Sequence, residues 1–270
     1  MSLSKGVFIA YKKDNSIYYR SSLTYRQKHV SLGSFNTEAK AHGCYLEGTN
    51  LLCSMLTIED YSLSDTHYLS FEKWVTLVNF RDNGIYFKNP IYLKPNFFLY
   101  YYDINTQYKF DVDDLFFYSN HKIMKRNGHL FTADYGMQIN ILSRYGIKNY
   151  AVCGRDYIFV NGDSTDFRYK NIKIINKYNG VSVSTKDGIN IYTAKIHING
   201  DYIIGRYKNE DDAAIAYNKA GQLLKDAGII HSFRENYIES LTPIQYAARH
   251  SSVKISKKII NLVNKATHEA

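Results

Sequence analysis

The sequence predicts an α+β protein in which two small modules flank a middle domain, with a helical tail at the C-terminus. Two observations predict this class. A pattern of three short strands and one helix occurs twice, near either end of the chain. Within the strands apolar residues alternate with period two, as in a half-buried antiparallel sheet. The 270 residues suffice for two or three small domains, and the 45% hydrophobic content argues against general disorder.

The two copies of the pattern match in the same order, with one extra turn residue near Gln27 in the first. Each begins with Gly-Val, continues through three strands and ends in a helix that carries Ala and Tyr four residues apart. The matching segments are residues 6–7, 19–23, 30–35 and 37–45 in the first copy and 180–181, 192–196, 202–207 and 209–217 in the second. Each copy is therefore expected to form a three-stranded antiparallel sheet with one helix.

Alternation assigns one face of each sheet to its helix. That face is expected to carry Ser21, Leu23, Val30 and Leu32 in the first copy, and Ala194, Ile196, Tyr202 and Ile204 in the second. Asn199-Gly200 is typical of a hairpin turn, and Thr37 and Asn209 are expected helix N-caps. The pairs expected to face the sheets are Ala41 with Tyr45 and Ala213 with Tyr217.

The repeated pattern resembles the Apetala-type (ethylene-response-factor) DNA-binding domain, over residues 178–235 and, less closely, 5–52. In the first copy His42-Gly43-Cys44 replaces small apolar helix residues. In that family the open sheet face lies in the DNA major groove. The resemblance implies DNA contacts by Arg20, Ser22, Thr24 and Arg26, and by Thr193, Lys195 and His197, flanked by Lys12, Lys28, Lys186 and Arg206. The alternative is a solvated face without a ligand, and the second face has few arginines for base readout.

The stretch from Asp156 to Ile172 resembles the HNH homing-endonuclease signature. Phage enzymes of that family often carry one Apetala-type module directly after the signature, as here. The resemblance implies a ββα-metal-like domain over residues 95–176, in which Asn161-Gly162-Asp163 turns from a strand into a helix. Asp166 and Arg168 are expected to pair locally.

The HNH positions that carry chemistry are replaced. Ile158 stands at the metal-binding Asp, Phe159 at the general-base His and Ser143 at an earlier His, leaving only Asn171 in register. Neither Ile nor Phe can bind a metal or move a proton. We therefore expect a degenerate, non-catalytic domain without metal or cofactor. Its Lys170 and Lys173 are expected either to meet DNA phosphates or to belong to a purely structural core.

Two stretches remain. Residues 56–94 form an unassigned connector, in which 70–78 fit either a short helix or a strand pair. Residues 236–270 predict a helical tail, with an ordinary helix start at Thr242-Pro243. An apolar stripe through Ile255, Ile259, Leu262 and Val263 is expected to dock on the body; a dimer seam and a position near DNA are the alternatives. The predicted boundaries are thus 1–55, 56–94, 95–176, 177–235 and 236–270.

Composition indicates which class of partner the chain binds. A net charge of +9 and a pI near 9.2 favour a polyanion. The three cysteines form no CxxC pair, and neither an apolar leader nor a run of about 18 apolar residues occurs, so we expect a cytoplasmic protein of a bacterial host without membrane contact. The leading interpretation is a non-catalytic double-stranded-DNA-binding protein of phage or mobile-element type, in the role of a regulator. The alternatives are an inhibitor of a host protein and, third, a residual endonuclease; the sequence leaves monomer and dimer open.

Overall fold

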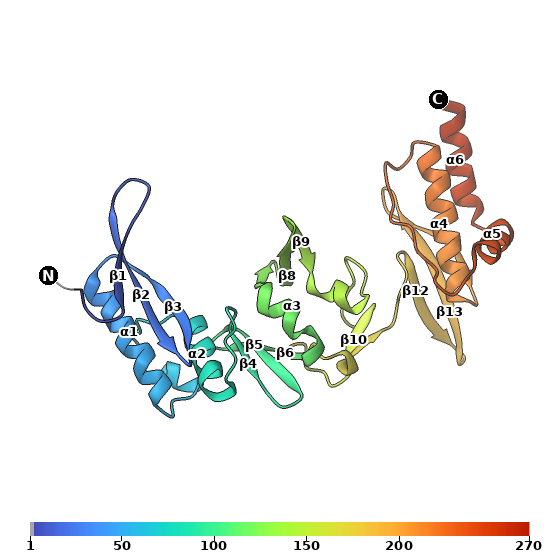
Figure 1. Cartoon of the computed structure of the whole chain (residues 1–270). Coiled ribbons are helices and arrows are strands. Elements are labelled where there is room, and N and C mark those ends of the chain that lie inside the picture. Colours follow the sequence, from blue (N-terminus) through green and yellow to red (C-terminus); the bar gives the residue numbers. More distant parts are fainter. Residues whose placement is uncertain (1–2, 270) are drawn as a thin grey trace. The chain divides into compact units, whose positions relative to one another are not determined.

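The computed structural model describes residues 3–269 (Figure 1). In this range it contains small antiparallel sheets and α-helices in alternation, which confirms the α+β class. Contacts divide the chain into two units. The first holds the residues up to 140 together with 163–171, and the second holds 141–162 together with 172 onward.

The first unit begins with β1 (Val7–Tyr11), β2 (Ile17–Tyr25), β3 (Lys28–Phe35) and α1 (Glu38–Cys53). The strands pair antiparallel in the order β1-β2-β3, as the repeat predicted. The helix covers the expected face, where Leu23, Val30 and Leu32 are buried. Thr37 is the N-cap, and its hydroxyl accepts from the Lys40 amide at 3.3 Å.

The connector is an integral part of this core. After a short 3-10 helix, η1 (Glu59–Leu63), it forms the α-helix α2 (Phe71–Asn83), which decides between the two predictions for residues 70–78. Every residue from Trp74 to Phe80 is buried. Trp74 and Leu77 belong to the same apolar cluster as Leu23 of β2 and Leu51 of α1. The first module is therefore one layer of a larger core.

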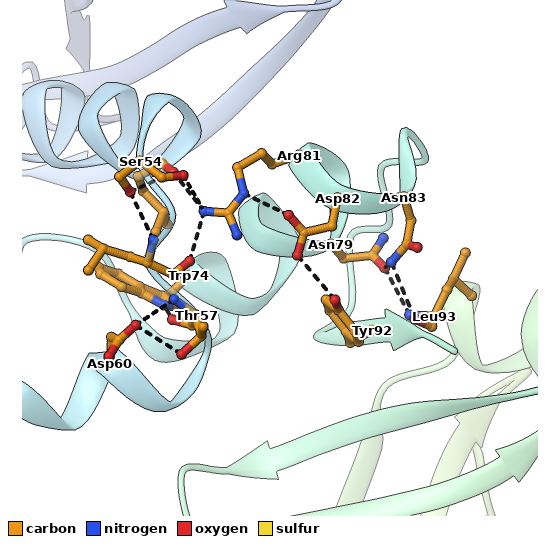
Figure 2. A network of polar contacts seen from close by, with 12 residues as sticks. Ser54, Thr57, Asp60, Trp74, Asn79, Arg81, Asp82, Asn83, Tyr92 and Leu93 are labelled. Carbon is orange, nitrogen blue, oxygen red and sulfur yellow. Dashed lines mark hydrogen bonds and ion pairs between the residues drawn. The ribbon is translucent and has the colours of Figure 1, made fainter. Parts of the chain in front are cut away.

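Polar contacts fasten α2 to its surroundings (Figure 2). The Arg81 guanidinium donates to the carbonyls of Leu51, Ser54 and Leu56 at 3.1, 2.9 and 2.8 Å, and so satisfies carbonyl groups at the C-terminal end of α1. Figure 2 also shows Asn79, whose side-chain oxygen accepts from the Leu93 amide at 2.9 Å. Arg81 and Asn79 thus tie α2 to both neighbouring segments.

The rest of the first unit is built from two further sheets. One consists of β4 (Ile91–Leu93), β5 (Phe97–Asp103) and β6 (Thr106–Asp111), and the other of β7 (Ile123–Arg126), β8 (His129–Asp134) and β9 (Met137–Asn140). Between them lie η2 (Val112–Asp114) and α3 (Leu115–Asn120). Aromatic rings fill the interior: Phe110 stacks on Phe167 with centroids 5.5 Å apart and lies 4.2 Å from the ring of Tyr118.

The segment that resembles the HNH signature, residues 156–172, has less helix than expected. In the second unit η3 (Ile141–Tyr145) precedes a two-stranded pair, β10 (Tyr157–Phe159) with β11 (Ile172–Ile174). The predicted turn is present, because the Gly162 amide donates to the Phe159 carbonyl at 3.0 Å. The prediction of a helix after this turn was wrong. The segment forms only one 3-10 turn, η4 (Tyr169–Asn171), and the chain then continues as β11.

The second module follows as β12 (Val181–Lys186), β13 (Ile189–His197), β14 (Asp201–Tyr207) and α4 (Glu210–Asp226). The order, the N-cap Asn209 and the burial of Ala194, Ile196 and Ile204 confirm the prediction. Ala213 is fully buried beneath the helix.

The tail docks on this module, as expected. It consists of α5 (Pro243–Ser252), with the predicted start at Thr242, and α6 (Lys257–Glu269). In Figure 1 α6 lies beside α4, and Ile259 is fully buried in the module's core. The Ser256 amide also donates to the Ile204 carbonyl of β14 at 2.7 Å.

The predicted middle domain, residues 95–176, is shared between the two units, with 95–140 and 163–171 in the first and the remainder in the second. None of the helices described within residues 3–269 is both long and apolar enough to cross a membrane.

Candidate nucleic-acid interface

The two modules share a backbone irregularity where the second strand pairs with the third. The register shifts between Ser21 and Ser22 in the first copy and between Ala194 and Lys195 in the second, and the extra residue of this β-bulge, Leu32 or Ile204, lies in the third strand. At this shift the backbone amide of the second strand donates to the carbonyl of the glycine that precedes the first strand. The Ser22 amide donates to the Gly6 carbonyl at 3.0 Å, and the Lys195 amide donates to the Gly180 carbonyl at 2.7 Å. A bulge changes the direction of side chains on a strand, and it occurs at the corresponding place in both copies.

Both glycines are required by their surroundings. Gly6 and Gly180 have φ of +78° and +69°, in the left-handed region that favours glycine. A Cβ atom would lie 2.0 Å from the Tyr45 ring at Gly6 and 2.2 Å from the Tyr217 ring at Gly180. The Gly-Val start and the helix tyrosine of the repeat are thus two halves of one contact.

The open face of the first sheet carries cationic and hydroxyl side chains but no carboxylate. Across the three strands Phe8, Arg20 and Ser34 are directly paired, on the face opposite α1. Arg20 is exposed and lies 5.7 Å from the Tyr18 ring centroid. The exposed polar residues of this face are Arg20, Thr24, His29, Ser31 and Ser34. The predicted positions Arg20 and Thr24 are therefore accessible.

Two other predicted positions differ from these. Ser22 pairs directly with Ser31 of the open face, but its side chain is covered and only 7% exposed. Arg26 lies in the hairpin turn, with φ of 45°, and its guanidinium donates to the Arg81 carbonyl of α2 at 3.2 Å. The prediction that both side chains belong to an accessible sheet face was wrong: Ser22 lies on that face but is covered, and Arg26 is exposed but lies beyond the end of β2.

The open face of the second sheet is less uniformly cationic. Lys195 and Arg206 are exposed, while Thr193 is half-buried and directly paired with Arg206. The His197 imidazole lies 3.1 Å from the Asp201 carboxylate, with both side chains largely exposed. An acid thus stands beside one of the three positions predicted for DNA contact on this face.

The remaining predicted positions lie outside the two faces. Lys12 follows β1, Lys186 ends β12, Lys170 lies in η4 and Lys173 in β11, and all four are exposed. Lys170 and Lys173 belong to different units. Lys28, at the start of β3, is exposed as well and lines a groove along that edge strand.

This groove of about 700 Å³ was missed by the sequence analysis. Besides Lys28 and His29 it is lined by Lys73, Lys88 and Phe87, and no Asp or Glu belongs to its lining. Its residues come from β3, α2, the stretch after α2 and the end of α3. The one signal in the sequence is Lys73, a cation in the first turn of a helix, where the helix dipole disfavours positive charge.

The second unit has a hollow of about 360 Å³ beside Lys195, in which Asp156 neutralises the other nearby cations. The Asp156 carboxylate meets Lys148 at 3.0 Å and Arg155 at 2.7 Å, and accepts from the Val152 amide at 2.8 Å. Burial opposes ionisation of this carboxyl, but these hydrogen bonds and the Lys148 charge leave its pKa lowered. The hollow is therefore held together by an internal ion cluster.

The HNH-like positions make structural contacts. Ile158 and Phe159 pair with Lys173 and Ile172 in the short sheet, and Ser143 lies in η3. The buried Asn171 donates to the Asp166 carbonyl at 2.8 Å. Among residues 3–269 no cluster of three or more His, Cys, Asp or Glu side chains is arranged to hold a metal ion.

The carboxylates of this loop bind the loop itself. Asp163 accepts from the Thr165 hydroxyl and amide at 2.6 and 2.9 Å, which lowers its pKa. Asp166 receives two hydrogen bonds from the Arg168 guanidinium, at 2.8 and 2.5 Å, which confirms the predicted pair. The hydrogen bond to Asp166 raises the pKa of Arg168.

No protein-family model, no curated protein and no solved structure matches this chain. Its function therefore has to be inferred from its own sequence and geometry.

Proposed function

We propose that the chain is a non-catalytic protein that binds double-stranded DNA through the open sheet faces of its two modules. The observation that carries the proposal is the exposed row on the first sheet, which presents Arg20, Thr24 and His29 without a carboxylate. The same construction recurs in the second module, with Lys195 and Arg206. The helix covers one face of each sheet and leaves the other open to a ligand.

The physical case rests on shape and charge. The major groove of B-form DNA admits narrow β-structure, and an arginine can form two hydrogen bonds to guanine there. Lysines and arginines around such a face neutralise phosphates. Two weakly binding faces in one chain reinforce each other because the second binding event becomes intramolecular. Arg20 is thus the best candidate for base readout, and Lys195 for a phosphate contact.

The non-catalytic part of the proposal rests on the HNH-like segment, in which Ile158 and Phe159 stand where the resemblance expects a metal ligand and a base. A regulator of phage or mobile-element type, acting in the cytoplasm of a bacterial host, is the role that this combination favours. The three cysteines, Cys44, Cys53 and Cys153, are free, as a reducing compartment favours.

The test is selection of bound duplexes from a random pool by the full chain, followed by a salt titration on the enriched sequence. We expect an enriched motif and a log–log salt slope near −5 to −9, because two or three engaged surfaces neutralise roughly 6–10 phosphates at about −0.9 each. Absence of duplex binding at low salt contradicts the proposal.

A protein partner is the second candidate. The observation that favours it is the apolar component of both faces, where Phe8 is 52% exposed and Ile203 is 42% exposed. Such residues are typical of protein interfaces. A protein partner is favoured over DNA if duplex selection fails and a Phe8→Ser variant loses a protein partner that the wild-type chain retains.

A further inference from the structure

We propose that the groove along β3 is a second nucleic-acid site, specific for a single-stranded segment. It lies wholly within the first unit and lies between β3, α2 and the end of α3. Arg20 and Thr24 of the open sheet face do not line it, whereas His29 and Ser31 at the edge of that face do. The proposal goes beyond duplex binding and does not depend on it.

The charge of the groove is uncompensated. Lys28 and Lys88 are exposed, and within the described chain their ammonium groups make neither an ion pair nor a hydrogen bond. The half-buried Lys73 ammonium has only a neutral hydrogen-bond partner, the Tyr86 hydroxyl at 3.0 Å, and lies 5.5 Å from that ring's centroid. Three lysines without a carboxylate, beside the positive end of α2, attract a polyanion.

Lys73 is also locally unfavourable. It occupies the first turn of α2, where a cation opposes the helix dipole although Glu72 supplies an acid in the same turn, and it is partly desolvated there. Residues that contradict local preference without structural compensation are expected at functional sites. An anionic ligand in the groove would add a charged partner to the neutral Tyr86 contact that Lys73 already has.

The aromatic lining distinguishes a single strand from a duplex. Phe87 is half-buried in the groove, and no other described aromatic ring packs against it, whereas Tyr86 packs on Phe80 with centroids 5.7 Å apart. Phe87 therefore borders the groove without an aromatic partner among the described residues. In a duplex the base faces are already stacked, while a single strand presents them. Cationic grooves with aromatic platforms are typical of single-strand binding.

The test is fluorescence anisotropy of a labelled oligothymidylate of about ten nucleotides, a length within the usual site size, with the full chain. Lys28→Gln/Lys88→Gln changes two exposed side chains and is expected to lower the salt slope by about 1.4, at 0.7 per phosphate contact on a single strand. Phe87→Leu is expected to weaken binding about five- to a hundredfold with little change in slope, because it removes stacking only. Lys73→Gln serves as a third variant.

The matched control is Lys40→Gln/Lys125→Gln, which removes two exposed lysines that do not line the groove and is expected to bind the oligonucleotide like the wild type. Circular dichroism verifies that each variant is folded. The proposal is overturned if the wild-type chain does not bind the oligonucleotide, or if the groove variants bind it as tightly as the control. Duplex binding is measured separately with Arg20→Ala, which changes a sheet-face residue outside the groove, whereas Phe87 and Lys88 line the groove and lie outside the sheet, so the two proposals fail independently.

Discussion

Asn218 and Asn236 exchange two hydrogen bonds: the Asn236 amide donates to the Asn218 side-chain oxygen, and the Asn218 side-chain nitrogen donates to the Asn236 carbonyl, each at 2.8 Å. The Asn236 side chain forms the same kind of exchange with the backbone of Asn179, at 2.7 and 3.1 Å. Both Asn218 and Asn236 are buried. The Asn218 and Asn236 side chains together thus join α4, the segment before β12 and the chain leading into the tail.

We therefore expect Asn236→Ala to lower the free energy of unfolding by about 1–3 kcal/mol, because the backbone amide and carbonyl of the half-buried Asn179 lose their hydrogen-bond partner. Urea denaturation of the full chain measures the change. Asn264→Ala, at an exposed position of α6, is the control and should be nearly neutral. Equal stability of the two variants would contradict this account of the clamp.

Gly180→Ala should destabilise the second module more than Gly188→Ala. Both glycines have positive φ, +69° and +76°, so both substitutions strain the backbone by about 1–2 kcal/mol. Only at Gly180 does the new Cβ also overlap the Tyr217 ring, at 2.2 Å, and at Gly188 no atom lies within 4 Å. Thermal unfolding of the two variants separates the contact from the strain. Identical losses would show that Tyr217 yields freely.

Arg20→Ala should weaken duplex binding by about 1–3 kcal/mol and broaden the selected motif, if its guanidinium reads a base edge. Lys195→Ala should instead weaken all duplexes alike and lower the salt slope by about one. Arg26→Ala is the informative comparison, because that guanidinium is bound to the Arg81 carbonyl. Arg26→Ala should alter the free energy of unfolding with little effect on the selected DNA motif. A broadened motif would show that Arg26 contacts base edges.

The Asp156 ion cluster predicts a pH dependence of stability. Because the folded-state pKa of Asp156 lies below its ordinary value of 3.8, the ionised carboxylate stabilises the fold above that pH, and the contribution is lost as pH falls through the folded-state pKa. The stability difference between the wild type and Asp156→Asn should therefore be full at neutral pH and shrink below about pH 4. Asp187→Asn, in an exposed turn, should show no such difference. If the stability difference between the wild type and Asp156→Asn stays constant below about pH 4, ionisation of Asp156 does not contribute to stability.

Supercoiled plasmid incubated with the chain and Mg²⁺, Mn²⁺ or Zn²⁺ should stay intact, because Ile158 and Phe159 supply neither a metal ligand nor a base. Agarose electrophoresis reports nicking. Metal-dependent nicking that Asn171→Ala abolishes would reinstate an active HNH site and remove the non-catalytic proposal.

The repeat, its caps and its buried faces were predictable because they depend on local patterns. Alternation assigned Leu23 and Ile204 to the covered faces, and both are buried. Thr37 and Asn209 indicated where the helices begin, because their side chains are preferred at the N-cap position. The helix expected after Gly162 was not found, since the resemblance supplied it and the local residues instead bind one another in a loop.

By itself, then, the sequence determined two sheet-plus-helix modules, a docked helical tail and a basic chain. Which polar side chains are accessible or engaged depends on tertiary packing. Ser22 is covered although it lies on the open face, and the Arg26 guanidinium is engaged because α2 brings the Arg81 carbonyl within reach. Lys28, Lys73 and Lys88 are distant in the chain and meet only when the connector packs into the first core. Periodicity encodes which face of an element is buried, whereas the meeting of distant side chains depends on how those faces pack.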